Sequence, residues 1–200
     1  VVNARVSKDL CDEVVEEINA LGGEAISCLA DISNPEAVSF LIDQTTDSFG
    51  GVDILVNNAA VRSNIPFLEI DQEEWSRIAG TCLQGTLNLT RECIPLMIER
   101  GGGAIVSLAG LSSYKGSVGR SHVMATKDGL MGLTRGIAIE FGEKNIRANA
   151  AVVGRFDTVR SGNSLQTGFT TEPDIPLGRM GVPQDMADVI RFLVGPGSAY

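Results

Sequence analysis

The sequence lacks several features that would place it in other classes of protein. No apolar run reaches about 18 residues, the length that a helix needs to cross a bilayer, so we expect no membrane-spanning segment. A single histidine, His122, excludes a metal site built from several histidines. Acidic side chains outnumber basic ones by 25 to 16, and the net charge of −9 disfavours a protein that binds nucleic acid by neutralising phosphates.

The four cysteines show no C-x-x-C spacing, which is typical of zinc and redox sites. Cys11, Cys28, Cys82 and Cys93 lie instead inside periodic apolar segments. This placement predicts buried thiols that behave as small apolar side chains and stay reduced. Reduced thiols in turn indicate a cytoplasmic protein.

Apolar patterns with a helical repeat alternate with short apolar strands along the whole chain. With 44% hydrophobic and 20% charged residues, the 200 residues fit one globular domain. Helices are predicted over residues 7–21, 33–49, 71–99, 121–141 and 183–193, and strands over 1–5, 25–30, 52–56, 104–109 and 147–152. This alternation predicts an α/β fold with a doubly wound parallel sheet of the Rossmann type.

Local signals predict where several of these helices begin. Ser7 is expected to cap the first helix, and residues 33–36, Ser-Asn-Pro-Glu, have the pattern of a capping box. Asp71, three residues before Glu74, is expected to open the long helix 71–99. The segment 110–120 is rich in glycine and serine and is predicted to be a loop.

Five segments, in order and at the expected spacing, resemble the short-chain dehydrogenase/reductase family. They are Asp31-Ile32, Asn57-Asn58-Ala59-Ala60, Ala125-Thr126-Lys127, residues 146–158 and Pro176-Leu177-Gly178-Arg179-Met180-Gly181. The resemblance covers residues 1–200 and implies a nicotinamide dinucleotide cofactor with a small carbonyl or alcohol substrate.

The resemblance also implies which residues hold the cofactor. Asp31, with Ile32 beside it, contacts the adenine, while Asn58 and Ala59 support the cofactor from the next turn. Lys127 holds the ribose, and Phe156 and Thr158 face the cofactor from the last matching loop. Asp31 alone also suits a solvated helix-capping residue, and Thr158 alone an ordinary loop hydroxyl.

Arg5 bears on which cofactor is preferred. Family members that use NAD carry an acidic residue near this position, which accepts the ribose hydroxyl groups. This chain has an arginine there, and a guanidinium pairs well with a 2′-phosphate. The sequence therefore favours NADP over NAD, with a solvated arginine as the alternative.

The sequence departs from the family in its phosphate-binding loop, because no Gly-x-x-x-Gly-x-Gly pattern occurs. Residue 1 aligns inside the family's second strand, and the chain stops before its last strand. We therefore expect a single partial domain, truncated at both ends, that lacks the first strand and its glycine-rich loop. That strand belongs in the middle of the sheet, so the strands at 1–5 and 25–30 should lack a link to the others.

A second departure lies in the reaction centre. The family uses Tyr-x-x-x-Lys, a serine 13 residues before the tyrosine, and an asparagine on the preceding long helix. Lys127 is present, but Val123, Gly110 and Cys82 occupy the other three positions.

Several neighbouring side chains are candidates to replace the missing groups. His122 has suitable proton chemistry but lies roughly 140° around the helix from Lys127, so it is also read as a helix-start or surface histidine. Ser112 or Ser113 is a candidate to replace the serine, and Tyr114 is a distant candidate acid. The alternative for Lys127 is a ribose contact without a role in the chemistry.

The sequence thus predicts an NAD(P)-dependent oxidoreductase of a carbonyl or alcohol substrate with an altered or weakened active site. The alternatives are a non-catalytic nucleotide-binding or assembly subunit that kept the fold, and an inactive fragment. By resemblance, we expect a homodimer or homotetramer that forms through helices 72–99 and 121–141.

Overall fold

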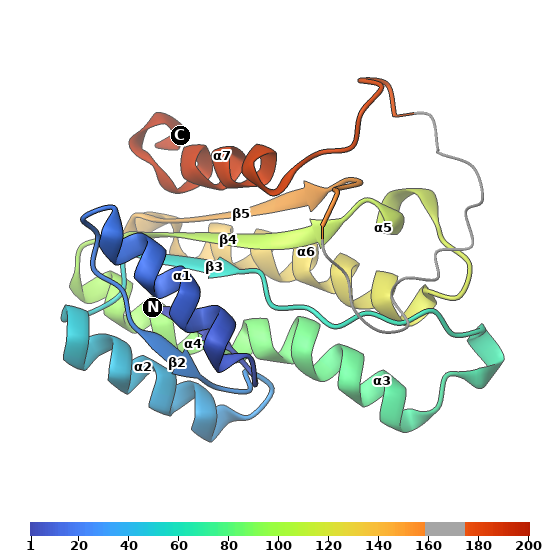
Figure 1. The fold of residues 1–200 in the computed structure, drawn as a ribbon, viewed down its shortest axis with the longest axis horizontal. Helices are drawn as coiled ribbons and strands as arrows, with labels where there is room; N and C mark the ends of the chain where they lie inside the picture. The colour runs from blue at the N-terminus through green and yellow to red at the C-terminus, as the bar shows by residue number, and fades with distance from the viewer. Residues whose placement is uncertain (159–174) are drawn as a thin grey trace.

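The structure, a computed structural model, describes residues 1–158 and 175–200 (Figure 1). Its strands are β1 (Val2–Ala4), β2 (Ser27–Leu29), β3 (Ile54–Asn57), β4 (Gly103–Gly110) and β5 (Ile146–Val153). Its main helices are α1 (Lys8–Ala20), α2 (Pro35–Phe49), α3 (Gln72–Ala79), α4 (Gly85–Glu99), α5 (Ser112–Lys115), α6 (Ser121–Phe141) and α7 (Pro183–Val194). Every pair of neighbouring strands is parallel, which confirms the predicted α/β fold.

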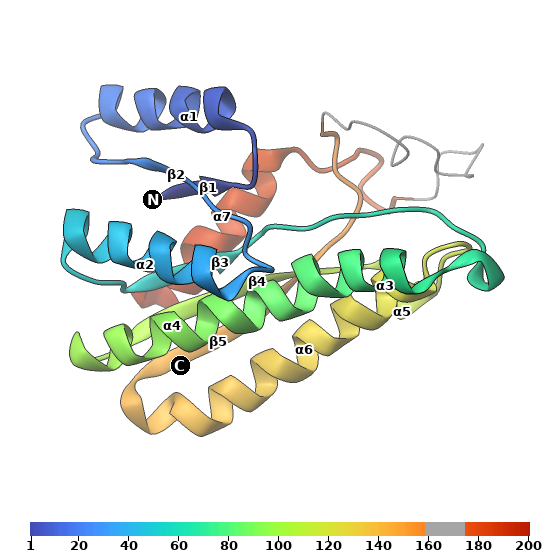
Figure 2. The ribbon, with the colours of Figure 1, turned by 90° about the horizontal axis from the view of Figure 1, so that it is seen from below.

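Helices cover both faces of the sheet β3–β4–β5 (Figure 2). Ile105 of β4 packs with Cys93 and Met97 of α4 and with Ile137 of α6. The next strand positions point to the opposite face, where Val106 and Leu108 belong to a cluster that contacts α7. β4 is therefore buried on both sides. The nearly continuous apolar run at residues 52–56 predicts the same for the neighbouring strand, but β3 leaves Ile54 and Val56 exposed, at 49% and 38%, because only one of its faces is covered.

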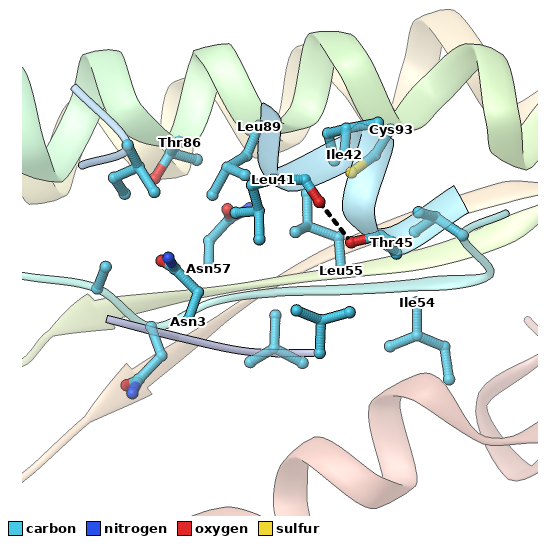
Figure 3. A pocket seen from close by; sticks show the side chains of 16 residues that line it. Asn3, Leu41, Ile42, Thr45, Ile54, Leu55, Asn57, Thr86, Leu89 and Cys93 are labelled. Carbon is cyan, nitrogen blue, oxygen red and sulfur yellow. Dashed lines mark hydrogen bonds between the residues drawn. The ribbon is translucent and has the colours of Figure 1, made fainter. Parts of the chain in front are cut away.

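The sheet is in two parts. β1 pairs with β2, and β3 pairs with β4, but the described residues show no ladder between β1 and β3. A cavity of about 340 Å³ lies between them, lined by Val1 and Asn3 on one side and by residues 54–59 on the other (Figure 3). The predicted gap in the middle of the sheet is thus confirmed, and the edges of β1 and β3 that line the cavity pair with no strand among the described residues.

The structure confirms some of the predicted capping residues of the helices and corrects others. Asp71 caps α3 by accepting from Glu74 N at 2.8 Å, as predicted. The capping residue of α2 is Asn34 and not Ser33, because Pro35 occupies the first helical position and the cap is the residue before it. Ser7 forms no side-chain capping hydrogen bond, since its backbone, at ψ 66°, lacks the extended conformation of a capping residue.

The long helix predicted over residues 71–99 contains a π-helical turn, η2 (Gly80–Gln84), between α3 and α4. The predicted loop 110–120 contains the short helix α5. All four cysteines are buried and free, as predicted. None of the helices within residues 1–158 and 175–200 combines the length and the apolar character needed to span a bilayer.

Candidate active site

The predicted reaction centre lies where β4 ends and α6 begins. Lys127 of α6 is only 7% exposed, and its Nζ donates to the carbonyl oxygen of Leu108 at 2.5 Å. Burial is the main cause that lowers the pKa of Lys127; the nearby thiol of Cys82 opposes this shift and the charge of Arg62 adds to it. The lysine thus carries its charge in a desolvated place, a feature that clusters at functional sites.

Gly110, at the end of β4, stands where the family carries its serine. A methyl group built on Gly110 would lie 3.7 Å from Ser112 Oγ and 3.9 Å from Lys127 Cγ, which is ordinary van der Waals contact. The fold therefore brings Ser112 and Lys127 to the same spot, beside the place of the missing serine. Ser112 is the first residue of the short helix α5.

The two other departures in the reaction centre are buried. Val123 lies one helical turn before Lys127 on the same face of α6 and is 5% exposed, so an apolar wall replaces the tyrosine. Cys82 lies in the π-helical turn and points its Sγ at the carbonyl oxygen of Val61, at 3.5 Å. Neither side chain supplies the hydrogen-bonding groups that the family has at these positions.

The residues predicted to contact adenosine meet at the ends of β1 and β2. Arg5 Nη1 lies 3.9 Å from Asp31 Oδ2, and the arginine side chain is 62% exposed. Asp31 Oδ1 also accepts from the backbone N–H and the hydroxyl of Ser33. These hydrogen bonds, led by the hydroxyl of Ser33 and helped by the charge of Arg5, lower the pKa of Asp31 against the opposing effect of burial.

Three of the predicted cofactor residues, Ile32, Asn58 and Ala59, line the cavity between the two sheets. Asn57 lies beside them and is buried; its Nδ2 donates to Ser107 Oγ at 3.3 Å, but its Oδ1 has no partner among the described residues. Asn57 was named in the sequence motif but not among the predicted contacts, and the structure shows it as an unused buried acceptor.

Phe156 and Thr158 lie beyond the end of β5. Phe156 forms an isolated parallel bridge with Gly181, and Asp157 N donates to Gly181 O at 2.7 Å. Gly181 is in close contact with the Phe156 ring, since a methyl group there would approach the ring to 2.8 Å. Two of the motifs found in the sequence, 154–158 and 176–181, are therefore neighbours in space.

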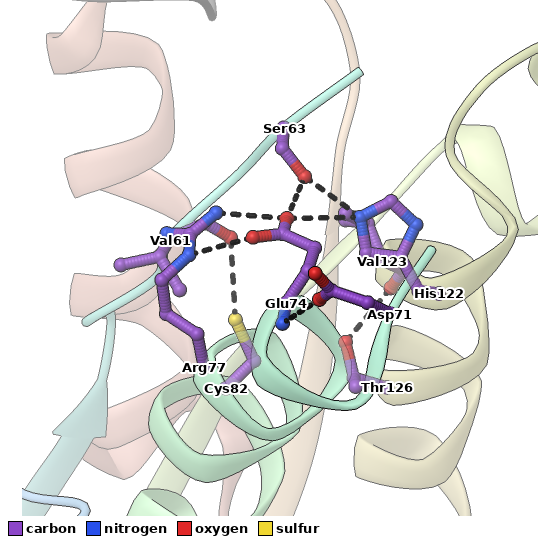
Figure 4. Close-up of polar contacts among 9 residues, drawn as sticks. All are labelled: Val61, Ser63, Asp71, Glu74, Arg77, Cys82, His122, Val123 and Thr126. Carbon is purple, nitrogen blue, oxygen red and sulfur yellow. Dashed lines mark hydrogen bonds and ion pairs between the residues drawn. The ribbon is translucent and has the colours of Figure 1, made fainter. Parts of the chain in front are cut away.

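His122 is buried, which contradicts its interpretation as a surface histidine, although it does lie in the first turn of α6. Its Nε2 lies 2.7 Å from Ser63 Oγ and 3.3 Å from Glu74 Oε1 (Figure 4). Glu74 also accepts from Arg77 Nε and Nη2, both at 2.8 Å. Ser63 and Arg77 were not predicted, and Glu74 was predicted only as part of the helix start at Asp71, because charged residues three apart on a helix indicate no site by themselves.

Known proteins resemble this chain in sequence and in fold. A family model described as enoyl-(acyl carrier protein) reductase matches residues 1–200. A crystal structure from Sinorhizobium meliloti 1021, assigned as a short-chain alcohol dehydrogenase, superposes with a TM-score of 0.90 at 32% identity and covers 100% of this chain and 80% of that one. The chain belongs to the short-chain dehydrogenase/reductase family.

Two further family members resemble this chain over all or nearly all of its length. A 3-oxoacyl-[acyl-carrier-protein] reductase from a Synechocystis species is 34% identical over 204 residues, which cover 100% of this chain and 81% of that protein. A 3-ketoacyl-ACP reductase from Sinorhizobium meliloti 1021 superposes with a TM-score of 0.89 at 28% identity, covering 99% of this chain and 82% of that one. These similarities support an NAD(P)-dependent oxidoreductase.

The residues at both ends of the predicted cofactor site fit a nicotinamide dinucleotide. At the adenosine end, Asp31 offers a carboxylate of lowered pKa, and Arg5 offers an exposed guanidinium beside it. At the other end, Leu108 O accepts one of the three N–H groups that the ammonium of Lys127 can donate. The remaining donors suit ribose hydroxyl groups.

Proposed function

We propose that this protein is an NADP-preferring oxidoreductase that reduces carbonyl substrates, with 3-oxoacyl thioesters as the first class to test. The substrate class rests on the names of the relatives, which are 3-oxoacyl and 3-ketoacyl reductases. The observation that carries the proposal is the buried ammonium of Lys127, which lies beside Gly110 and Ser112 at the end of the central strand.

Each group has a defined task in this proposal. Bound NADPH supplies the hydride. Lys127 binds the ribose, and its lowered pKa makes its ammonium a better proton donor than an exposed lysine. Ser112 donates a hydrogen bond to the substrate carbonyl oxygen in place of the serine that Gly110 replaces. Asp31 and Arg5 bind the adenosine end, where the guanidinium favours the 2′-phosphate of NADP.

The site lacks the tyrosine that would transfer the proton directly, so the proposed reaction is slow. A positioned general acid contributes about 10²–10⁴-fold to a rate, and Val123 contributes nothing of this kind. The same observation favours a second candidate function, a subunit that binds the nucleotide without catalysis. Val123, Gly110 and Cys82 are the residues that distinguish this candidate from an ordinary family member.

Equilibrium titration tests the shared part of both candidates. The intact protein is titrated with NADPH and NADH, and the fluorescence of each nicotinamide ring is followed. We expect saturable binding of both, tighter for NADPH. Equal affinities would refute the cofactor preference, and no binding of either nucleotide would refute both candidates.

We also propose that the protein acts in the cytoplasm as a homodimer or homotetramer. Four free, buried cysteines support a reducing compartment. Apolar side chains exposed on α4 and α6, such as Leu87, Ile98 and Ile139, support contact between subunits. Light scattering at micromolar concentration tests the assembly, and a strict monomer would contradict it.

A further inference from the structure

The connection between β3 and α3 reaches the protein interior at a single side chain. Of residues 58–77, Ser63 alone is buried, at 7% exposure. This connection follows directly after Asn57 and carries Asn58 and Ala59, which line the cavity at the proposed cofactor site. The contacts of Ser63 therefore bear on how that end of the site is held.

Those contacts come from two different helices. Glu74 belongs to α3 and His122 to α6, and both lie within hydrogen-bonding distance of the Ser63 hydroxyl (Figure 4). Arg77, one turn after Glu74, binds both oxygens of the Glu74 carboxylate. We call Ser63, Glu74, Arg77 and His122 the serine anchor.

The geometry of the serine anchor determines where its protons lie. Arg77, with help from Ser63 and His122, lowers the pKa of Glu74, so this carboxylate accepts hydrogen bonds only. The Ser63 hydroxyl has one proton, and it donates this proton to Glu74. The 2.7 Å contact between Ser63 Oγ and His122 Nε2 then needs a proton on Nε2.

The other ring nitrogen takes no part in the serine anchor. His122 Nδ1 is buried and has no partner among the described residues. The geometry thus assigns a proton to His122 Nε2, which donates it to Ser63 Oγ.

This arrangement differs from a hydrolytic triad, although it contains serine, histidine and glutamate. In a triad, the serine donates to one imidazole nitrogen and the carboxylate binds the other. Here Ser63 donates to the carboxylate, both groups meet the same nitrogen, and Nδ1 is unused. Ser63 is therefore not activated as a nucleophile.

We propose that His122 is a positioning residue: through Ser63, it holds the segment 58–66 against α3 and α6 and so shapes the nucleotide site at Asn58 and Ala59. This role differs from the proton relay that the sequence predicted for His122. The effect on nucleotide binding rests on the proposed function, whereas the anchoring of the segment does not.

His122 is the only histidine of the chain, so the imidazole nitrogen signals of the ¹⁵N-labelled protein belong to this residue, and their couplings to the ring C–H protons distinguish Nδ1 from Nε2. We expect a protonated Nε2, with or without added NADPH. A ring with a bare Nε2 would overturn the proton assignment.

Two substitutions separate positioning from proton transfer. His122→Gln keeps an N–H donor near the place of Nε2 but cannot act as an acid or base at neutral pH, whereas His122→Ala removes the donor. We expect His122→Ala and Ser63→Ala to raise the Kd for NADPH by about tenfold or more, as for the loss of a buried hydrogen bond to a charged cluster. We expect His122→Gln to stay near the wild-type Kd.

Steady-state kinetics distinguish a positioning role of His122 from a proton relay. If His122 positions the segment, His122→Gln keeps kcat and KM near the wild-type values, and His122→Ala raises the KM for NADPH more than it lowers kcat. Equal loss of kcat in His122→Gln and His122→Ala, with unchanged nucleotide binding, would overturn the proposal and restore the relay. Ser76→Ala is the matched control, because Ser76 is an exposed serine on α3 outside the serine anchor.

Hydrogen exchange keeps the proposal testable if the protein binds no nucleotide. We expect faster exchange of the backbone amides of residues 58–66 in His122→Ala and Ser63→Ala than in the wild type, His122→Gln and Ser76→Ala. Unchanged exchange in all four variants would overturn the anchoring itself, whatever the outcome of the activity assays.

Discussion

Restoring the missing groups of the reaction centre is the strongest perturbation that the structure suggests. In Val123→Tyr with Gly110→Ser, the tyrosine hydroxyl returns one helical turn before Lys127, on the same face of α6. The first side-chain atom of the serine meets no clash, since a Cβ atom at Gly110 would lie 3.7 Å from Ser112 Oγ and 3.9 Å from Lys127 Cγ. The tyrosine is larger than the buried valine and costs about 1–3 kcal/mol of stability by overpacking.

The expected gain in activity follows from the chemistry of the added hydroxyl. A positioned general acid is worth about 10²–10⁴-fold, or about 2.7–5.4 kcal/mol of activation free energy at 1.36 kcal/mol per decade. We expect the double variant to oxidise NADPH with a 3-oxobutanoyl thioester at least about 100-fold faster than the wild type. The assay is the substrate-dependent loss of nicotinamide absorbance, with a thermal melt of each variant to confirm folding.

A matched control isolates the hydroxyl group. Val123→Phe with Gly110→Ser adds the same ring and the same serine but no acid, so its rate should stay within a few-fold of the wild type. If a folded double variant gains no activity, or if the phenylalanine control gains as much, then Lys127 and the substrate are not aligned with position 123 and the proposed site is wrong.

Three further predictions follow from the charged residues. Arg5→Ala should reduce the preference for NADPH over NADH by about tenfold, measured by titration of both nucleotides. An unchanged ratio of the two Kd values would show that Arg5 does not cause the preference. Lys127→Met should weaken NADPH binding yet raise the melting temperature at pH 7, and a lower melting temperature for the variant would contradict the cost of the buried charge. Because burial lowers the pKa of Lys127, the wild type should also gain stability as the pH rises toward 10.5. Because the pKa of Glu74 lies below 4.5 in the folded state, the stability that it contributes is present above that pH and is lost as the pH falls through the folded value. As the pH is lowered below 4.5, the melting temperature should therefore fall less steeply in Glu74→Gln than in Glu73→Gln, which is an exposed control on the same helix.

Much of the fold could be predicted from the sequence, because periodic apolar patterns carry most of the information. The alternation of helical and strand patterns predicts a parallel sheet, and its strand β4 is covered by α4, α6 and α7. Burial on both faces was wrong for residues 52–56, because β3 leaves Ile54 and Val56 exposed on one face. The gap between β1 and β3 was also predictable, from the family pattern. The π-helical turn at Cys82 was not, because one extra residue in a helical turn leaves no mark in a pattern of apolar spacing.

The candidate site was predictable only where a motif carries it. Lys127 and Asp31 were found because they lie in motifs, and the structure places each at the end of a strand or at the helix that faces it. The serine anchor was not found, because Ser63 lies in an irregular segment whose path depends on tertiary contacts. The burial of His122 was missed for the same reason: its partners are distant in the sequence, at separations of 59 and 48 residues.

Hydride transfer by the unmodified protein tests the proposed function most directly. NADPH that carries deuterium on the transferring carbon is incubated with the intact protein and a 3-oxobutanoyl thioester, and the 3-hydroxy product is analysed by mass spectrometry. The account predicts slow, enzyme-dependent transfer of deuterium to the carbinol carbon, which is lost in Lys127→Met. Saturable binding of NADPH without any transfer of deuterium would contradict it and leave the non-catalytic nucleotide-binding subunit.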